Sequence, residues 1–305
     1  GNKKIERYFT YSTYKEELLT EPLDHLKIKF KDILYDVFND LIQSLKNKTV
    51  VIPLSGGYDS RLIACMMKEM GYEDVICFTY GKKDSFEVFT SKEVASKLGY
   101  KWYFVEYKKN LYLEIVKKDI FYEYLDFDFN FVSLPHTQDF FAVYYLKKNY
   151  LIPENSVFIP GHSGDFFAGT HIYNVNYNSN KMHIANEIFN HHYILSDYCS
   201  YKHELINRIF FQLKDGLPWT VMENWDLENR QAKFIVNSLR VYEFFGYENR
   251  IPLWNPKLAN YFKKIDIKYK NRNNSYKLKN NLYDSIAMKI FNKYNVDIKK
   301  KVSNN

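Results

Sequence analysis

The sequence contains few cysteines, with only Cys65, Cys77 and Cys199 among its 305 residues. None of them belongs to a C-x-x-C pair, which argues against a zinc ribbon or a redox-active dithiol. Their apolar or aromatic neighbours indicate buried, reduced side chains. Apolar runs of membrane-spanning length are lacking, and no signal peptide is recognisable. We therefore expect a cytoplasmic protein that has no membrane partner.

Aromatic residues, by contrast, are abundant, and 28 Tyr and 24 Phe contribute to a hydrophobic content of 46%. A chain of this length and composition can bury a substantial core in one or two domains. The formal net charge is +7, but the lysines are scattered and interleaved with acidic residues. This distribution is more typical of a solvated surface than of a nucleic-acid-binding patch. Nucleic acid is therefore not expected as a partner.

Strand-like and helix-like patterns alternate in the first half of the chain. The strand-like runs are Thr49–Leu54, Val75–Tyr80, Trp102–Tyr107 and Ser156–Pro160. Helical periodicity separates them at Tyr58–Met70, Phe86–Leu98 and Asp139–Lys148. Such alternation predicts an α/β fold in which a parallel sheet carries helices on both faces.

The periodicity also suggests three parts of the chain. Residues 1–48 form a helical lead-in with an amphipathic pattern at Leu26–Leu45, and residues 49–173 form the α/β core. From about Asn174 the pattern becomes helical and polar, with Gln231–Phe245 as its clearest amphipathic segment. We therefore expect residues 174–305 to add a C-terminal helical subdomain beside the sheet.

The string S-G-G-Y-D-S at positions 55–60 follows the first strand-like run and leads directly into a helical pattern. Small residues let backbone N–H groups close around an anion at a helix N-terminus, where the dipole is positive. The Ser55 and Ser60 hydroxyls add donors, and the Asp59 carboxylate is placed to hold Mg²⁺. The Walker sequence G-x-x-x-x-G-K-[ST] is absent. A plain connecting turn is the alternative, but the full string in this context favours a phosphate-holding loop.

A second glycine-containing string, G-H-S-G-D-F-F-A-G at positions 161–169, follows the fourth strand-like run. Gly161 and Gly164 can let backbone amides approach phosphate oxygens. The His162 imidazole titrates near neutrality and could take a proton from a nitrogen nucleophile. A loop histidine can equally be a structural hydrogen-bonding residue, so both interpretations of His162 stay open.

A third segment, E-N-R-I-P-L-W-N, occupies positions 248–255. The residue before a proline is extended, and such a backbone could orient the nearby Arg250 guanidinium towards a carboxylate or a phosphate. Alternatively, Glu248 and Arg250 form a structural ion pair that holds the helical subdomain on the sheet. Both hypotheses stay open, and the ion pair is favoured.

Together, the three strings resemble the synthetase domain of the asparagine synthetases and β-lactam synthetase, which belong to the PP-loop ATP pyrophosphatases. The resemblance implies an adenine nucleotide α-hydrolase-like fold, ATP as substrate and Mg²⁺ shared by Asp59 and Asp165. It implies that ATP or pyrophosphate is held by Leu54, Ser55, Gly56, Gly57, Asp59, Ser60, Thr79, Tyr80, Gly161 and Gly164.

The resemblance also implies two catalytic residues. His162 stands where relatives place a Glu or a Tyr near the attacking nitrogen. Lys299 lies at about the distance past Glu248 at which relatives carry a phosphate-neutralising lysine, with Lys300 and Lys301 as alternatives. Two positions depart from the pattern: Phe166 replaces an acidic residue after Asp165, and Asn255 replaces an aspartate.

The implied activity is adenylation of a small carboxylate, followed by attack of ammonia or an amine to form an amide. The second string is similar to asparagine-synthetase-like proteins of surface-polysaccharide biosynthesis, so the acceptor is expected to be an amino acid or a sugar acid. Ser55 comes too early for a preceding glutaminase domain, so we expect either a protein with the synthetase part alone or a chain that has lost an N-terminal part. Nitrogen is therefore expected from free ammonia, a separate glutaminase or an amine. A PP-loop tRNA-modifying enzyme and a degenerate nucleotide-binding scaffold are the alternatives.

Overall fold

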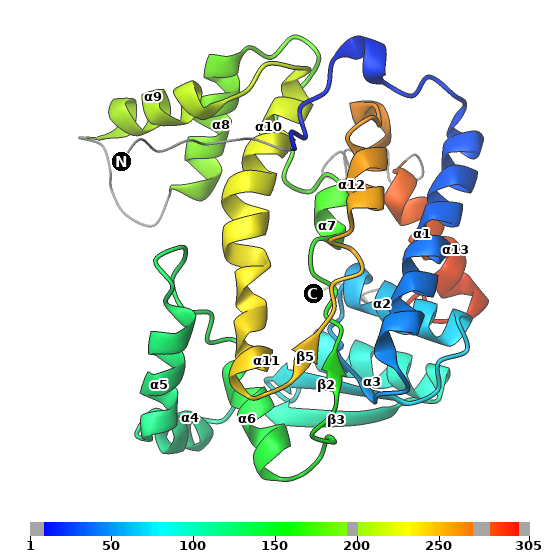
Figure 1. Cartoon of the computed structure of the whole chain (residues 1–305), viewed down its shortest axis with the longest axis vertical. Coiled ribbons are helices and arrows are strands. Elements are labelled where there is room, and N and C mark those ends of the chain that lie inside the picture. The colour runs from blue at the N-terminus through cyan, green and yellow to red at the C-terminus, as the bar shows by residue number, and fades with distance from the viewer. Residues whose placement is uncertain (1–8, 194–200, 271–280, 299–305) are drawn as a thin grey trace, which may run out of the picture.

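The computed structural model describes residues 9–193, 201–270 and 281–298 (Figure 1). Strands in these residues form one sheet in the order β3-β2-β1-β4-β5, and all neighbouring strands are parallel. The strands are β1 (Val50–Pro53), β2 (Val75–Gly81), β3 (Lys101–Glu106), β4 (Val157–Phe158) and β5 (Glu248–Asn249). The first four coincide with the predicted runs. The sequence patterns did not indicate β5, which has two residues and comes from the C-terminal part.

Helices cover both faces of the sheet because its central strands are apolar on both sides. In β1, Val50 and Ile52 enter one core cluster, whereas Val51 enters another. Alternate side chains of a strand point to opposite faces, so both faces are buried. The predicted α/β class with a parallel sheet between helices is confirmed.

The first face is covered by helices from both ends of the chain. In α1, apolar residues recur at spacings of three and four, so one stripe that includes Leu26, Phe30 and Leu34 is buried. Figure 1 shows α1, α2 and α13 on the same side of the molecule, and α13 contacts both α1 and α2. The helices on this face are α1 (Leu23–Leu45), α2 (Tyr58–Glu69), α3 (Phe86–Leu98), α12 (Pro256–Phe262) and α13 (Leu282–Lys293).

The second face is covered by an aromatic-rich layer. Phe140 stacks on Tyr124 with ring centroids 4.6 Å apart, and Phe158 of β4 stacks on Tyr242 at 4.3 Å. The helices of this layer are α4 (Lys109–Ile115), α5 (Asp119–Asp128), α6 (Phe140–Lys148) and α11 (Arg240–Phe244). This layer accounts for part of the high aromatic content.

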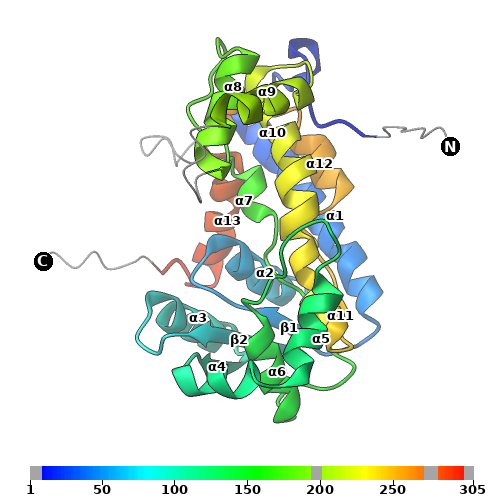
Figure 2. The same ribbon diagram turned by 90° about the vertical axis from the view of Figure 1, so that its left-hand side faces the viewer.

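Helices α8 (Lys181–His192), α9 (Lys202–Gln212) and α10 (Pro218–Asp226) form the other end of the molecule, away from the sheet (Figures 1 and 2). The short helix α7 (Gly164–Phe167) contacts α2, and 3-10 turns occur at Lys15–Glu17, Asn237–Leu239 and Ile267–Tyr269. The predicted helix Gln231–Phe245 is divided, because a π-helix at Leu227–Ile235 continues α10 and the 3-10 turn precedes α11. Helices thus predominate in the C-terminal part, but β5 joins the sheet and α11, α12 and α13 join the layers around it, and the division of the chain at residue 174 stays a prediction.

The buried core agrees with the cysteine interpretation. Cys65 and Cys77 are buried free thiols, and burial raises the pKa of Cys65 to about 12. Cys199 lies outside the described residues. None of the helices in the described ranges is both long and apolar enough to cross a lipid bilayer.

Candidate active site

A cavity of about 500 Å³ lies at the carboxyl ends of β1, β2 and β4. Ligands of open parallel sheets bind at this edge, because the loops that follow the strands converge there. The predicted site residues that line the cavity are Leu54, Ser55, Gly57, Asp59, Ser60, Thr79, Tyr80, Gly161, His162 and Asp165. Residues 55–60 are called the first loop below, and residues 161–169 the second loop.

The first loop is held in shape by its own hydroxyl groups. The Ser55 backbone N–H donates to Ser60 Oγ at 3.1 Å, and the Gly57 N–H donates to Ser55 Oγ at 3.1 Å. Gly57 precedes α2 without a side-chain cap, so the first turn of a 12-residue helix has amides available to an anion. This geometry suits a phosphate group.

A buried arginine, not anticipated from the sequence, supports the first loop from behind. Arg61 is 1% exposed. Its Nη2 donates to the Gly56 carbonyl at 2.8 Å, and its Nη1 donates to the Val296 carbonyl at 3.0 Å. Gly56 does not line the cavity. We infer that Arg61 ties the loop backbone to the segment after α13.

The glycines of the second loop allow the two loops to touch. A Cβ atom at Gly161 would lie 2.4 Å from the Ser60 backbone nitrogen. At Gly164, a Cβ atom would lie 2.5 Å from Asp59 Oδ1 and 2.4 Å from the Tyr283 hydroxyl. Both glycines are therefore needed for loop-to-loop packing. The sequence suggested approach to phosphate instead, and Gly164 is not among the residues that line the cavity.

This packing brings Asp59 and Asp165 to one cavity. Asp59 Oδ1 accepts a hydrogen bond from the Tyr283 hydroxyl at 2.8 Å, and Asp165 Oδ2 accepts one from Thr170 Oγ1 at 3.3 Å. A carboxylate offers about four lone-pair positions in all. Two carboxylate groups beside a phosphate-binding loop are a donor set that Mg²⁺ prefers, since it uses one or two carboxylates together with phosphate oxygens and water.

His162 is oriented by a serine from the segment before α11. Its Nε2 lies 2.9 Å from Ser238 Oγ, while Ser238 Oγ donates its proton to the Ile235 carbonyl at 2.7 Å. Nε2 must then be the donor to Ser238, which leaves Nδ1 as the acceptor nitrogen. Burial lowers the pKa of His162 below its usual value, so the neutral form is favoured. A neutral imidazole with a free acceptor nitrogen can take a proton.

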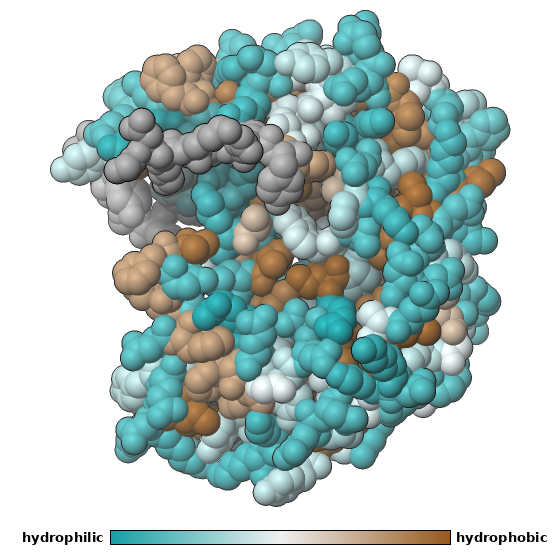
Figure 3. Space-filling model, viewed as in Figure 1, coloured by the Kyte–Doolittle hydropathy of each residue, from teal (hydrophilic) through white to brown (hydrophobic). Residues whose placement is uncertain are grey.

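One wall of the cavity is formed by the helices on the second face of the sheet. It carries residues to which the sequence analysis gave no functional role. Asp139 is 8% exposed, and its oxygens accept hydrogen bonds from the Tyr80 and Tyr242 hydroxyls. The sequence marked Asp139 only as the start of a helix. Lining residues without a predicted role are His136, Gln138, Asp139, Phe234, Ile235 and Ser238. His136 and Gln138 lie in the segment between α5 and α6. The exposed apolar residues earlier in this segment are Phe129, Phe131, Val132 and Leu134, and Figure 3 shows apolar surface on this side of the molecule.

Arg250, in the third string, is not among the residues that line the cavity. Arg250 Nη2 pairs with Glu248 Oε2 at 2.8 Å, and Glu248 also pairs with Lys48. The favoured ion pair is therefore present, and the structure gives no support to contact between Arg250 and a substrate. Asn255 caps α12, since its Oδ1 accepts the Lys257 N–H at 2.8 Å. An amide can replace an aspartate in that role.

Phe166 has become part of the core. It is fully buried, stacks on His171 with centroids 4.6 Å apart and meets the Tyr11 ring edge-on at 5.1 Å. An apolar ring therefore fills the place where relatives have an acid. The predicted catalytic Lys299 lies outside the described residues.

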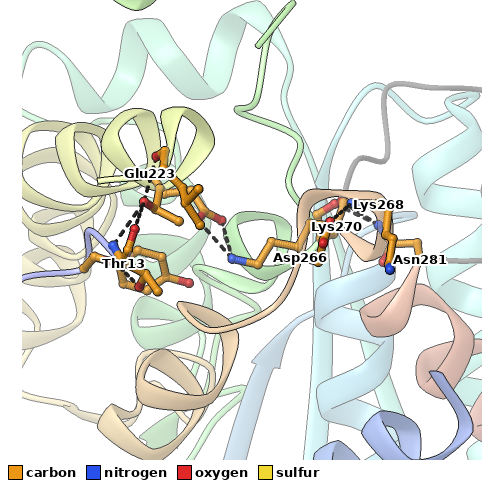
Figure 4. Close-up of polar contacts among 10 residues, drawn as sticks. Thr13, Glu223, Asp266, Lys268, Lys270 and Asn281 are labelled. Atoms are coloured by element: carbon orange, nitrogen blue, oxygen red, sulfur yellow. Dashed lines mark hydrogen bonds and ion pairs between the residues drawn. The ribbon is translucent and has the colours of Figure 1, made fainter. Parts of the chain in front are cut away.

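A fully buried ion pair lies beside the C-terminal end of the second loop (Figure 4). Lys270 Nζ lies 2.8 Å from Glu223 Oε1, and both side chains are fully buried. Burial raises the pKa of Glu223 to about 7 and lowers that of Lys270. Asn281 Nδ2 donates to the carbonyls of Lys270 and Ala168 at 2.7 and 2.9 Å. The pair thus anchors the backbone beside the second loop.

A parallel sheet with an uncapped helix N-terminus and two carboxylates in one cavity is typical of nucleotide-binding α/β proteins. The model of the asparagine synthase family matches residues 41–280, and the chain belongs to this family. This membership supports an ATP-dependent amide-forming ligase. No curated protein matches the chain.

One solved structure with similarity to the chain is an NH3-dependent NAD synthetase from Campylobacter jejuni subsp. jejuni NCTC 11168, in complex with the nitrate ion. The match covers 72% of this chain and 96% of that chain, with 15% sequence identity and a TM-score of 0.33. At this score the likeness supports no statement about function.

Proposed function

We propose that this protein adenylates a small carboxylic acid with ATP and then joins the acyl group to a nitrogen nucleophile. The products are an amide, AMP and pyrophosphate. An amino acid or a sugar acid serves as the acceptor, and ammonia or an amine supplies the nitrogen. The surface-polysaccharide pathway is proposed from the form of the second loop alone.

The observation that carries this proposal is the contact between the two loops. Because Gly161 and Gly164 admit the first loop, Asp59 and Asp165 line the same cavity as the amino end of α2. Phosphate oxygens would accept hydrogen bonds from the first-loop amides and the hydroxyls of Ser55 and Ser60. Tyr80, at the end of β2, lines the side of the cavity where the base is expected.

Mg²⁺ fits the residues that are present. Asp59 and Asp165 would hold it, and the ion would neutralise phosphate charge when bound. Among residues 9–193, 201–270 and 281–298, no cluster of three or more His, Cys, Asp or Glu side chains could hold a metal. This agrees with an ion that completes its coordination with phosphate oxygens and water.

The chemistry requires two steps. An acceptor oxygen attacks the α-phosphorus, and the bond to pyrophosphate breaks. The nitrogen nucleophile starts as ammonium or a protonated amine. It loses one proton to Nδ1 of His162, and the neutral nitrogen then attacks the acyl carbon. The carbon–oxygen bond to AMP breaks, and AMP leaves with the bonding electrons. A second proton passes from the nitrogen to solvent, which completes the amide.

ATP–pyrophosphate exchange against a panel of amino acids and sugar acids tests the first step. We expect exchange that depends on the acid, and AMP as the nucleotide product of the full reaction. Asp59→Asn should reduce exchange by about 10²- to 10³-fold, since it removes a charge that binds Mg²⁺ beside the phosphates. The control is Asp74→Asn, at the amino end of β2, where Asp74 accepts a hydrogen bond from Thr49 Oγ1 at 2.8 Å. Exchange without an acid, ADP as product, or full activity of Asp59→Asn would contradict the proposal.

A further inference from the structure

Asp139 presents a fixed carboxylate in the cavity wall. Tyr80 Oη donates to its Oδ1 at 2.5 Å, and Tyr242 Oη donates to its Oδ2 at 2.6 Å. Tyr80 comes from the end of β2, and Tyr242 comes from α11, so two separate elements orient the group. A carboxylate has about four lone-pair positions, so each oxygen can accept another donor.

The two tyrosines provide hydrogen bonds without positive charge. Burial and the neighbouring Asp139 raise the pKa of both Tyr80 and Tyr242, so both hydroxyls remain neutral donors. In the described part of the chain, no Lys or Arg forms an ion pair with Asp139. An ionised carboxylate that is removed from bulk water and lacks a cation is costly. A positively charged ligand group would offset this cost.

The position of Asp139 separates it from the predicted Mg²⁺ ligands. Asp59 belongs to α2 on the first face of the sheet, whereas Asp139 directly precedes α6 on the second face. Only one carboxylate is present on the second wall, and both its oxygens already accept hydroxyl donors. This arrangement suits a ligand that donates N–H hydrogen bonds better than a divalent metal.

The other side chains that line the cavity include two titratable imidazoles, His136 and His162. Gln138 and Ser238 line the same cavity, as does His162, whose pKa is raised by the charge of Asp139 against the larger effect of burial. The carboxylate is therefore close enough to His162 to affect its charge. A cationic nitrogen at Asp139 would have His162 available to receive its proton.

We propose that Asp139, oriented by Tyr80 and Tyr242, binds a primary ammonium group in this cavity. This inference rests on the proposed function, which it deepens by assigning a charged substrate group to a residue. The ammonium group belongs either to the nitrogen donor or to the acceptor acid. The bonds to the tyrosines fix both oxygens of Asp139, and no Lys or Arg of the described residues pairs with them, so a ligand cation can serve as the counter-ion.

The test compares Asp139→Asn with the unmodified protein in two assays. Exchange uses ATP and the acid but no nitrogen donor, whereas amide formation can be titrated with ammonium chloride. Loss of a charged hydrogen bond predicts a KM increase of about tenfold or more. If KM for ammonium chloride rises most, the donor carries the group; if KM for the acid rises most in exchange, the acceptor carries it. Unchanged values for both would overturn the inference.

Two further variants keep the test decisive. Tyr242→Phe retains the charge but removes one orienting donor, so it should raise the same KM by a smaller factor. Asp74→Asn should change neither KM. Should Asp139→Asn fail to fold in thermal unfolding, Tyr80→Phe and Tyr242→Phe replace it, and unchanged values in both would also overturn the inference.

A binding measurement separates this inference from the proposed reaction. Should the unmodified protein show no exchange with any acid, the proposed function fails by itself. Titration of ¹³C-methylammonium chloride, followed by NMR line broadening, then tests Asp139 directly. Broadening that Asp139→Asn weakens about tenfold supports the ammonium site, and equal broadening with both proteins overturns it.

Discussion

Asp139 and Glu223 are both carboxylates removed from bulk water, but their oxygens meet different partners. Glu223 pairs with Lys270 in a region that is fully buried. Asp139 meets two neutral tyrosine hydroxyls and faces the cavity. The first carboxylate has its counter-ion within the fold, and the second does not. The comparison suggests that Glu223 serves the structure and that Asp139 serves a ligand.

The largest effect on stability is expected from breaking the buried ion pair of Glu223 and Lys270. Glu223→Gln leaves the Lys270 ammonium buried without a counter-charge, which should lower the free energy of unfolding by about 3–5 kcal/mol. Urea unfolding at neutral pH measures this change. By contrast, Asp139→Asn removes a carboxylate charge that has no counter-ion within the described part of the fold. The free energy of unfolding of this variant should therefore change far less.

A double variant checks the explanation. Glu223→Leu combined with Lys270→Met removes both charges and keeps similar volumes, so it should recover most of the lost stability. If the double variant were as unstable as Glu223→Gln, the pair would matter through its shape and not through its charges.

Asp226 is linked to Ser163 of the second loop through Gln231. We expect Asp226 to have a smaller, pH-dependent effect on the free energy of unfolding. Gln231 Nε2 donates to Asp226 at 3.1 Å, and Gln231 Oε1 accepts from Ser163 Oγ at 3.0 Å. Burial raises the pKa of Asp226 from 3.8 to about 6. The folded state therefore binds more protons than the unfolded state between these values, and stability falls as pH rises through this window.

Asp226→Asn should remove this loss, because an amide does not titrate. Relative to the unmodified protein, the variant should gain up to about 3 kcal/mol between pH 4 and pH 7. Urea unfolding at several pH values measures the difference. A difference that stays constant with pH would show that Asp226 titrates alike in both states.

Local strings allowed the sheet and the two loops to be predicted from the sequence. Residues 55–60 and 161–169 each follow a strand, and parallel strands bring their carboxyl ends together. Strand β5 was not predicted, because a strand of two residues is too short to show an alternation of apolar and polar side chains. The packing role of Gly164 was not predicted, because its neighbours, Asp59 and Tyr283, come from distant parts of the chain.

The partners of Asp139 could not be predicted for a similar reason. Asp139 lies 59 residues from Tyr80 and 103 residues from Tyr242. In a chain with 28 tyrosines, no spacing distinguishes these two from the others. Likewise, Lys270 and Glu223 are 47 residues apart, and no local pattern in the sequence pairs them. Side-chain contacts between residues that are far apart in the sequence leave no local sequence pattern, whereas a loop formed by consecutive residues does.

The smallest of these effects concerns His162, which stands beside the Asp139 wall. His162→Gln keeps a donor for Ser238 but removes the basic nitrogen, so amide formation should fall by about 10²-fold. Exchange should fall much less, since no nitrogen is deprotonated in that half-reaction. Rapid-quench measurement of both steps separates them. Because the pKa of His162 is lowered by burial, the amide-forming rate of the unmodified protein should rise with pH in a range below the ordinary histidine value. A variant with equal losses in both steps would show that His162 shapes the loop and takes no proton.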